Sequence, residues 1–204
     1  MTELSVLQAV RLKGRVTSAD LAATLGEDPD GIAAMLEQLT DSGLLGGGTT
    51  LKISPSGRAR LEDLLADERK GIDSATITAA YHDFRAVNAD FKALVTDWQL
   101  RGGPGGEPNT HDDAEYDAAV LARLDDMHTR VVPIIDAAAT QLPRLNVYSS
   151  KLLVALDKVK AGETAWLTRP LIDSYHTVWF EFHEELIGAA GLTRDDAARS
   201  GDAQ

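Results

Sequence analysis

The sequence of 204 residues contains no cysteine, which excludes disulfide bonds, zinc sites built on cysteine and thiol nucleophiles. It also has no apolar run near the roughly 20 residues that a membrane-spanning helix needs. Its first residues, MTELSVLQAVRLKGR, lack the basic segment, apolar core and cleavage site of a secretory signal. From these absences we expect a cytoplasmic protein that has no membrane partner.

Aromatic side chains are missing from the first part of the chain, because every Phe, Tyr and Trp lies between Tyr81 and Phe182. The chain is long enough to form two small domains. We therefore expect an aliphatic N-terminal domain over residues 1–71. A larger domain that contains the aromatic residues is expected over residues 72–204.

Positive charge is scarce, since 20 Lys and Arg residues stand against 32 Asp and Glu residues and give a net charge of −12. Residues 1–60 hold six basic and seven acidic residues, a net charge of −1, which leaves 14 basic and 25 acidic residues, a net charge of −11, for residues 61–204. Proteins bind DNA by placing Lys and Arg against its phosphates. The first part of the chain is therefore the part in which a locally basic, DNA-binding face is possible.

Two short helices separated by a tight turn are predicted in the first part. Thr17 or Ser18 caps the first helix, and Gly26 ends it, because glycine enters the left-handed C-terminal position at little cost. Asp28 caps the second helix, with Pro29 in its first turn. Apolar residues at helical spacing give this second helix one buried face: Ile32, Met35, Leu36 and Leu39.

A short hairpin and a further helix follow. Residues 44–53 consist of two apolar pairs around a glycine-rich tip, and Pro55 stands in the first turn of the next helix. The whole order resembles the winged helix-turn-helix of bacterial MarR-type regulators, through the stretches TSADLAATLG, LEQLTDSGLL and ISPSGRARLEDLL. This resemblance covers about the first third of the chain. It implies a DNA-binding transcriptional regulator with a short β-wing.

The predicted recognition helix carries neither Lys nor Arg on its solvent face. Gln38 is suited to reading adenine, and Asp30 is suited to accepting from the amino group of cytosine. Contacts to the phosphates of double-stranded DNA would then come from four other residues: Arg15, Lys52, Arg58 and Arg60. An alternative stays open, in which the winged helix binds no DNA and instead docks on a protein partner.

The second part is predicted to be an all-α bundle of four or so helices, without strands after residue 54. A long amphipathic helix is expected over residues 75–100, followed by a flexible loop, 101–110, that is rich in glycine and proline. Pro133 is expected to kink or divide the next helix, and the last helix is expected to begin near Pro170. The helices that begin at Ala75 and Pro170 are the predicted interface of a homodimer.

A pocket for a small-molecule effector is the second predicted site. It would be lined by aromatic and histidine side chains of the second part: Trp98, Trp166, Tyr175, His176, Trp179 and His183. The same residues also suit an ordinary core and dimer-interface helix. His176 and His183 are seven residues apart, and no HExxH or ExxH pattern is present, so we expect no metal site.

No set of residues indicates catalysis. The histidines lack the nucleophile, base and orienting group that a catalytic site requires. The glycine runs 46–48 and 102–106 match neither a P-loop nor a dinucleotide fingerprint. We therefore expect no enzymatic activity and no cofactor.

The C-terminal stretch WLTRPLIDSYHTVWFEFHEELIGAAG is faintly similar to a helical segment attached to some pyruvate, phosphate dikinase-like proteins. The phosphocarrier histidine motif of those enzymes is absent. This similarity implies an accessory module and not phosphotransfer.

Overall fold

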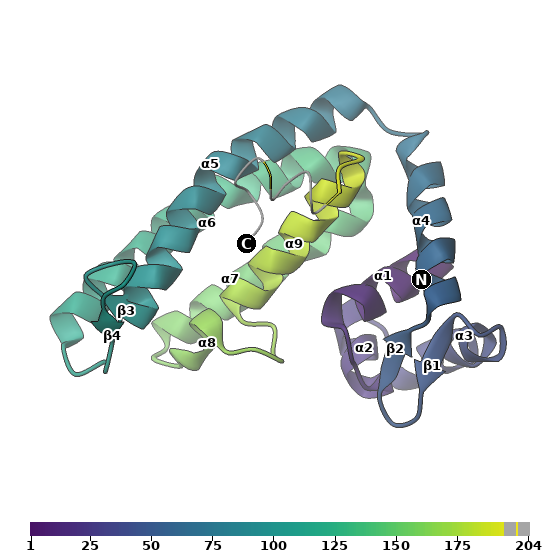
Figure 1. Cartoon of the computed structure of the whole chain (residues 1–204), viewed down its shortest axis with the longest axis horizontal. Coiled ribbons are helices and arrows are strands. Elements are labelled where there is room, and N and C mark those ends of the chain that lie inside the picture. Colours follow the sequence, from purple (N-terminus) through teal and green to yellow (C-terminus); the bar gives the residue numbers. More distant parts are fainter. Residues whose placement is uncertain (194–198, 200–204) are drawn as a thin grey trace. The chain divides into compact units, whose positions relative to one another are not determined.

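The computed structural model describes residues 1–193 and 199, and these form a mainly helical protein (Figure 1). The chain divides into two compact units, the first from Met1 to Ile72 and the second from Asp73 onward. The division lies one residue from the predicted boundary between residues 71 and 72.

The first unit contains four helices and one hairpin. Their bounds are α1 Glu3–Lys13, α2 Ser18–Leu25, α3 Pro29–Asp41, β1 Leu45–Gly47, β2 Leu51–Ile53 and α4 Pro55–Arg69. Thr17 caps α2 and Asp28 caps α3, each by accepting a hydrogen bond from a backbone N–H three residues further on. Gly26 follows α2 in the left-handed conformation, with φ of 70°. The predicted starts of these two helices are confirmed.

A small antiparallel sheet lies beside the helices of this unit. In it Leu45 pairs with Ile53, Gly46 with Lys52, and Gly47 with Leu51. Val16, which precedes α2, extends the sheet through two backbone hydrogen bonds with Leu51. The hairpin is therefore attached to the segment between α1 and α2.

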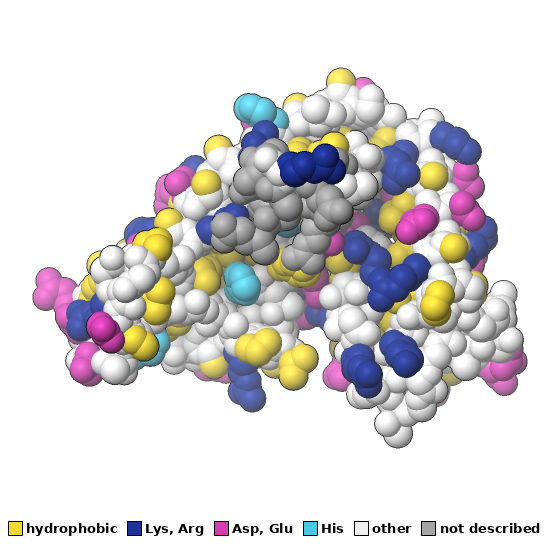
Figure 2. Space-filling model, viewed as in Figure 1, with side chains coloured by type: hydrophobic (Ala, Val, Ile, Leu, Met, Phe, Trp, Pro, Cys, Tyr) yellow, Lys and Arg dark blue, Asp and Glu magenta, His cyan; other side chains and the backbone are white. Residues whose placement is uncertain are grey.

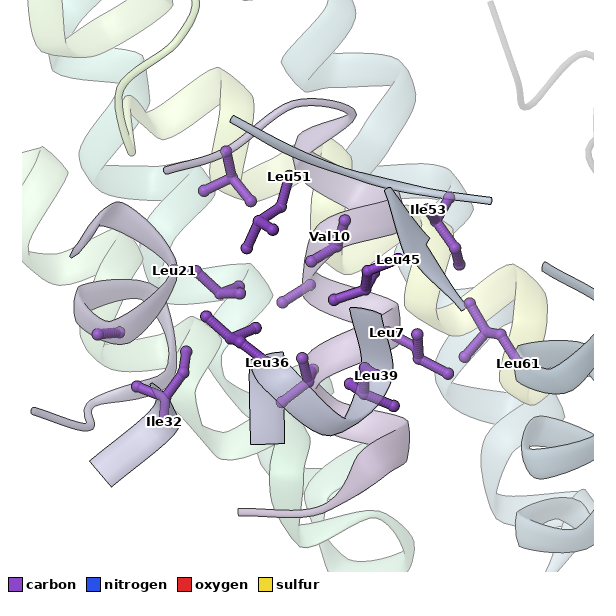
Figure 3. Packing of buried hydrophobic residues seen from close by; sticks show 14 residues of the cluster. Leu7, Val10, Leu21, Ile32, Leu36, Leu39, Leu45, Leu51, Ile53 and Leu61 are labelled. Carbon is purple, nitrogen blue, oxygen red and sulfur yellow. The ribbon is translucent and has the colours of Figure 1, made fainter. Parts of the chain in front are cut away.

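The core of the first unit is purely aliphatic, and every helix and strand contributes to it. Figure 3 shows the labelled side chains converging from α1, α2, α3, the hairpin and α4. Gly57 in α4 allows a close approach, because a Cβ atom there would lie 2.1 Å from the carbonyl oxygen of Leu44. The core thus fixes the hairpin against α4.

The second unit is built on two long helices, α5 and α6, that lie side by side, and on α7 and α9, which pack together (Figure 1). Its elements are α5 Ser74–Gln99, β3 Leu100–Arg101, β4 Glu107–Pro108, α6 Ala114–Gln141, a 3-10 helix Pro143–Asn146, α7 Val147–Lys160, α8 Ala165–Thr168 and α9 Tyr175–Ala189. Aromatic side chains of α5 and α9 fill the core between these helices.

The prediction that no strand follows residue 54 is wrong. Strands β3 and β4 pair across the glycine-rich segment, with Leu100 opposite Pro108. Two polar contacts hold this hairpin. The side chain of Arg101 forms an ion pair with Asp113, and the amide nitrogen Nδ2 of the buried Asn109 donates to the carbonyl oxygen of Trp98 at 3.1 Å. The flexibility of residues 101–110 stays a prediction.

Two predicted helix boundaries also need correction. Pro133 does not divide its helix, because α6 runs on to Gln141 with buried Val131 and Ile135 on either side of the proline. The last helix begins at Tyr175 and not near Pro170.

The late start of α9 has a local cause. Leu171 is left-handed, with φ of 68°, and this conformation interrupts any helix that begins before it. The buried Ser174 then caps α9, because its hydroxyl accepts a hydrogen bond from the N–H of Thr177.

Candidate nucleic-acid interface

Two cations flank the bridge by which Val16 joins the small sheet of the first unit, Arg15 in the bend before Val16 and Lys52 on β2. Val16 and Leu51 pair across the sheet and are both buried, 5% and 7% exposed. Successive residues of a strand point to opposite faces. The next residues along this antiparallel pair, Arg15 and Lys52, therefore point away from the core on the solvent face, where both are exposed.

The other neighbour of Lys52 across the hairpin is Gly46, which has no side chain. Lys52 thus has a cation on one side and open space on the other. Within residues 1–193 neither Arg15 nor Lys52 takes part in an ion pair. Figure 2 shows Lys and Arg side chains gathered on the visible face of the first unit, over α1 and β2. Neither cation on this sheet face is therefore neutralised by an ion pair with a described carboxylate.

The two other predicted DNA contacts, Arg58 and Arg60, lie on α4 and differ from each other. Arg58 is exposed and forms no ion pair with any described residue. Arg60 is already engaged, since its Nε and Nη2 atoms donate to the carboxylate of Glu3 at 3.0 and 2.9 Å. This hydrogen bonding by Arg60 lowers the pKa of Glu3 below its ordinary value. Arg60 therefore joins α4 to α1, and its guanidinium is less available to a phosphate.

Helix α3 presents an acidic face. Asp30, Glu37, Gln38 and Asp41 are all exposed, and the helix contains neither Lys nor Arg. The predicted base-contacting residues Asp30 and Gln38 are eight positions apart, which is about 12 Å along the helix axis. The two side chains are thus exposed as the prediction requires, but they do not form one cluster.

The predicted effector-pocket residues do not form one group. Tyr175 and Trp179 are buried, and both rings pack against Phe91, with centroid distances of 5.6 and 4.2 Å. The exposed His176 lies at the edge of the same group, 6.1 Å from Phe91. The indole Nε1 of Trp179 also donates to the buried Asn88 at 2.9 Å.

Of the remaining three residues, His183 is connected to Trp179 through Phe84, which packs against both rings, whereas Trp98 and Trp166 lie elsewhere. The ring of His183 packs against Phe84 at 5.1 Å. Trp98 is next to His111 at 4.3 Å, and Trp166 is under the ammonium group of Lys158 at 5.8 Å. These rings pack as core and surface contacts, and the effector pocket stays a prediction.

Sequence reasoning missed the ionisable groups that are buried between α7 and α9. Glu181, Glu184 and Glu185 of α9 are less than a tenth exposed. Glu185 accepts from Arg144 at 2.7 Å and lies 3.3 Å from the hydroxyl oxygen of Tyr148, whose pKa is raised by burial. The acidic run in α9 resembles a solvated face, and no local signal distinguishes it from one.

Comparison with protein-family models, with curated proteins and with solved structures gives no match to this chain. None of the described helices has the length and apolar character needed to cross a membrane. The described part of the chain also holds no cluster of three acidic or histidine side chains arranged to bind a metal ion.

Proposed function

We propose that the chain is a transcriptional regulator whose first unit is a winged helix-turn-helix that binds double-stranded DNA. Helices α2 and α3 would be the helix-turn-helix, and β1 and β2 would be the wing. The order of the elements and the resemblance to MarR-type regulators support this reading.

One observation supports the proposal, namely the bridge between Val16 and Leu51, which brings the exposed Arg15 and Lys52 to the next pair of positions, where neither forms an ion pair with a described residue. Like charges on opposite positions of two strands are destabilising, by up to about 1 kcal/mol. When DNA phosphates bind over the two cations, this repulsion is relieved, and counterions condensed on the DNA are released. In the described part of the acidic second unit, by contrast, most cations are in ion pairs: Arg101, Arg123, Arg130, Arg144, Lys151, Lys158 and Lys160.

The test is the binding of a fluorescent random-sequence duplex across a salt series. The full chain is compared with a double variant, Arg15→Ala with Lys52→Ala. We expect micromolar binding that weakens with salt, and a slope of log K against log salt that is smaller by about 2 in the double variant. Lys70→Ala is the matched control, because Lys70 is exposed but already paired with Asp67 at 2.7 Å. An equal loss in this control would contradict a local phosphate contact.

A second function, docking on a basic protein surface, is favoured by the acidic face of α3. Asp30, Glu37 and Asp41 would then contact cations of the partner. This function predicts no duplex binding by the full chain at any salt concentration. It also predicts binding to an immobilised polylysine peptide that weakens in a Glu37→Gln, Asp41→Asn variant.

A homodimer and a small-molecule effector complete the proposed regulator. Two copies would place two first units on the same duplex. Light scattering tests the first point, since the chain mass is 21.9 kDa and a dimer doubles it. A screen of small molecules by thermal shift and Trp emission tests the binding of an effector.

A further inference from the structure

We infer that Arg15, Lys52 and Gly46 form a phosphate-binding site that holds the backbone of duplex DNA of any base sequence, while α3 reads no bases. This inference rests on the proposed DNA binding and specifies its substrate class. It differs from the usual use of a helix-turn-helix, in which the second helix reads base edges in the major groove.

The three residues stand in one row across the small sheet. Lys52 is in the middle, with Gly46 opposite it on β1 and, on its other side, Arg15 next to the bridge between Val16 and Leu51. Adjacent strands are about 4.8 Å apart, so the two cationic side chains begin close together. Backbone phosphates are recognised by such clustered cations, and these contacts carry no sequence information.

Gly46 has a specific consequence for this site. A Cβ atom at this position would meet no atom within 4 Å, and Gly46 is not among the glycines with positive φ. The hairpin therefore does not need glycine there, in contrast to Gly47, whose φ is 119° and whose Cβ would lie 2.1 Å from the carbonyl oxygen of Thr50. The bare position next to Lys52 leaves room for a sugar-phosphate backbone to approach the ammonium group.

Helix α3 carries Gln38 and Asp30, which suit base contacts, but it has no cation that would hold it in the major groove. A recognition helix enters the major groove between two rows of phosphates. The exposed face of α3 brings Asp30, Glu37 and Asp41 toward those phosphates and offers no cation to offset the repulsion. Affinity then comes from the wing, and affinity that comes from phosphate contacts is independent of sequence.

The freedom of position 46 allows a direct test by a charge series in the full chain. Gly46→Lys, Gly46→Gln and Gly46→Glu place a positive, neutral or negative side chain next to Lys52 without strain on the backbone. We expect affinity for a random-sequence duplex in the order Lys, then Gln, then Glu, with about a two- to fivefold change per step, the effect of one exposed ion pair. The salt slope should rise by about 0.9 for Gly46→Lys.

Two controls separate a local site from general charge and from loss of fold. Glu62→Gln changes the net charge by the same amount as Gly46→Lys, but Glu62 is an exposed residue of α4 outside the row of Arg15, Lys52 and Gly46. It should alter affinity by less than about 1.5-fold, because salt screens exposed charges that are not in direct contact with the phosphates. Far-UV circular dichroism and the unfolding midpoint of each variant report the fold. If Gly46→Glu fails to fold, the comparison of Gly46→Lys with Gly46→Gln still tests whether affinity follows the charge at position 46.

A panel of unrelated duplexes tests the absence of base readout. We expect affinities within about threefold of one another, whereas specific binders discriminate by about a thousandfold or more. Strong preference for one duplex, abolished by Gln38→Ala, would overturn the inference and leave the proposed DNA binding intact. Equal affinities of the three Gly46 variants for the duplex would also overturn the inference and leave the proposed DNA binding intact. Absence of binding to every duplex at low salt would overturn both proposals.

Discussion

Two exposed arginines on one turn of α4 have different surroundings, and this difference assigns them different roles. Arg58 forms no ion pair within the described residues, whereas Arg60 holds the carboxylate of Glu3 with two hydrogen bonds. Two parallel N–H···O bonds fix the geometry of both side chains. Arg60 therefore ties α4 to the start of α1, across 57 residues of sequence.

Removal of this arginine should change the ionisation of Glu3. In the folded protein the hydrogen bonds from Arg60 lower the pKa of Glu3 below the ordinary value of 4.5. We expect that Arg60→Gln returns the Glu3 pKa toward 4.5, as measured by an NMR titration of its side-chain carboxyl carbon. Because Arg60 is already engaged, the same variant should weaken DNA binding less than Lys52→Ala does. A Glu3 pKa that does not move would show that the pair is absent in solution.

The sign of the linkage follows from that lowered pKa. The unfolded chain binds a proton at Glu3 near pH 4.5, and the folded chain binds it only at lower pH. The pair therefore contributes stability above about pH 4.5, and the contribution is lost as the pH falls through the lowered pKa.

At the scale of elements, the hairpin β3–β4 depends on one buried side chain. The Nδ2 atom of Asn109 donates to the carbonyl oxygen of Trp98 at 3.1 Å and to the carboxylate of Asp117 at 2.9 Å. The backbone N–H of Asn109 also donates to the carbonyl oxygen of Gln99. These bonds connect the end of the hairpin to both α5 and α6.

Asn109→Ala should therefore release the hairpin without unfolding the second unit. A buried acceptor left without its donor costs about 1–3 kcal/mol. We expect faster amide hydrogen exchange over residues 100–108 and a shift in Trp emission, since Trp98 lies next to the site. Thr110→Ala, at the neighbouring exposed position, is the control and should change neither quantity. Unchanged exchange in Asn109→Ala would contradict the role of this side chain.

The elements that the sequence predicted well are those whose ends are encoded locally. Thr17, Asp28 and Asp73 each cap a helix through a backbone N–H two or three residues away, so the signal lies in a short window. The starts of α2, α3 and α5 could be read for that reason. The spacing of apolar residues likewise indicated the buried face of α3, where Ile32 and Leu39 are almost fully buried.

The features that the sequence did not predict depend on contacts between distant residues. The strands β3 and β4 form because Arg101 and Asn109 find partners on α5 and α6, and the glycine and proline content of the segment suggested only a loop. The candidate site was only partly predicted. Arg15 and Lys52 were predicted as phosphate contacts from their charge alone. Their adjacency arises from the bridge between Val16 and Leu51, which no local sequence pattern predicts.

At the scale of the whole molecule, the two units have different kinds of core, and this provides a means to observe one of them alone. The first unit is aliphatic, and all three Trp residues belong to the second. Trp emission therefore reports unfolding of the second unit, while far-UV circular dichroism reports both.

Trp emission should show that the second unit loses stability in mild acid. His128 of α6 is partly buried, and this burial lowers its pKa below 6.5. Between about pH 6.5 and the lowered pKa, the unfolded chain binds more protons than the folded chain, so the free energy of unfolding falls as the pH falls through this range. We expect the urea midpoint followed by Trp emission to decrease from pH 7.5 to pH 5.5, and to decrease less in His128→Gln. His82→Gln is the matched control, because the side chain of His82 is 81% exposed. The same decrease in His128→Gln as in the original chain would show that His128 is not the source of the pH dependence.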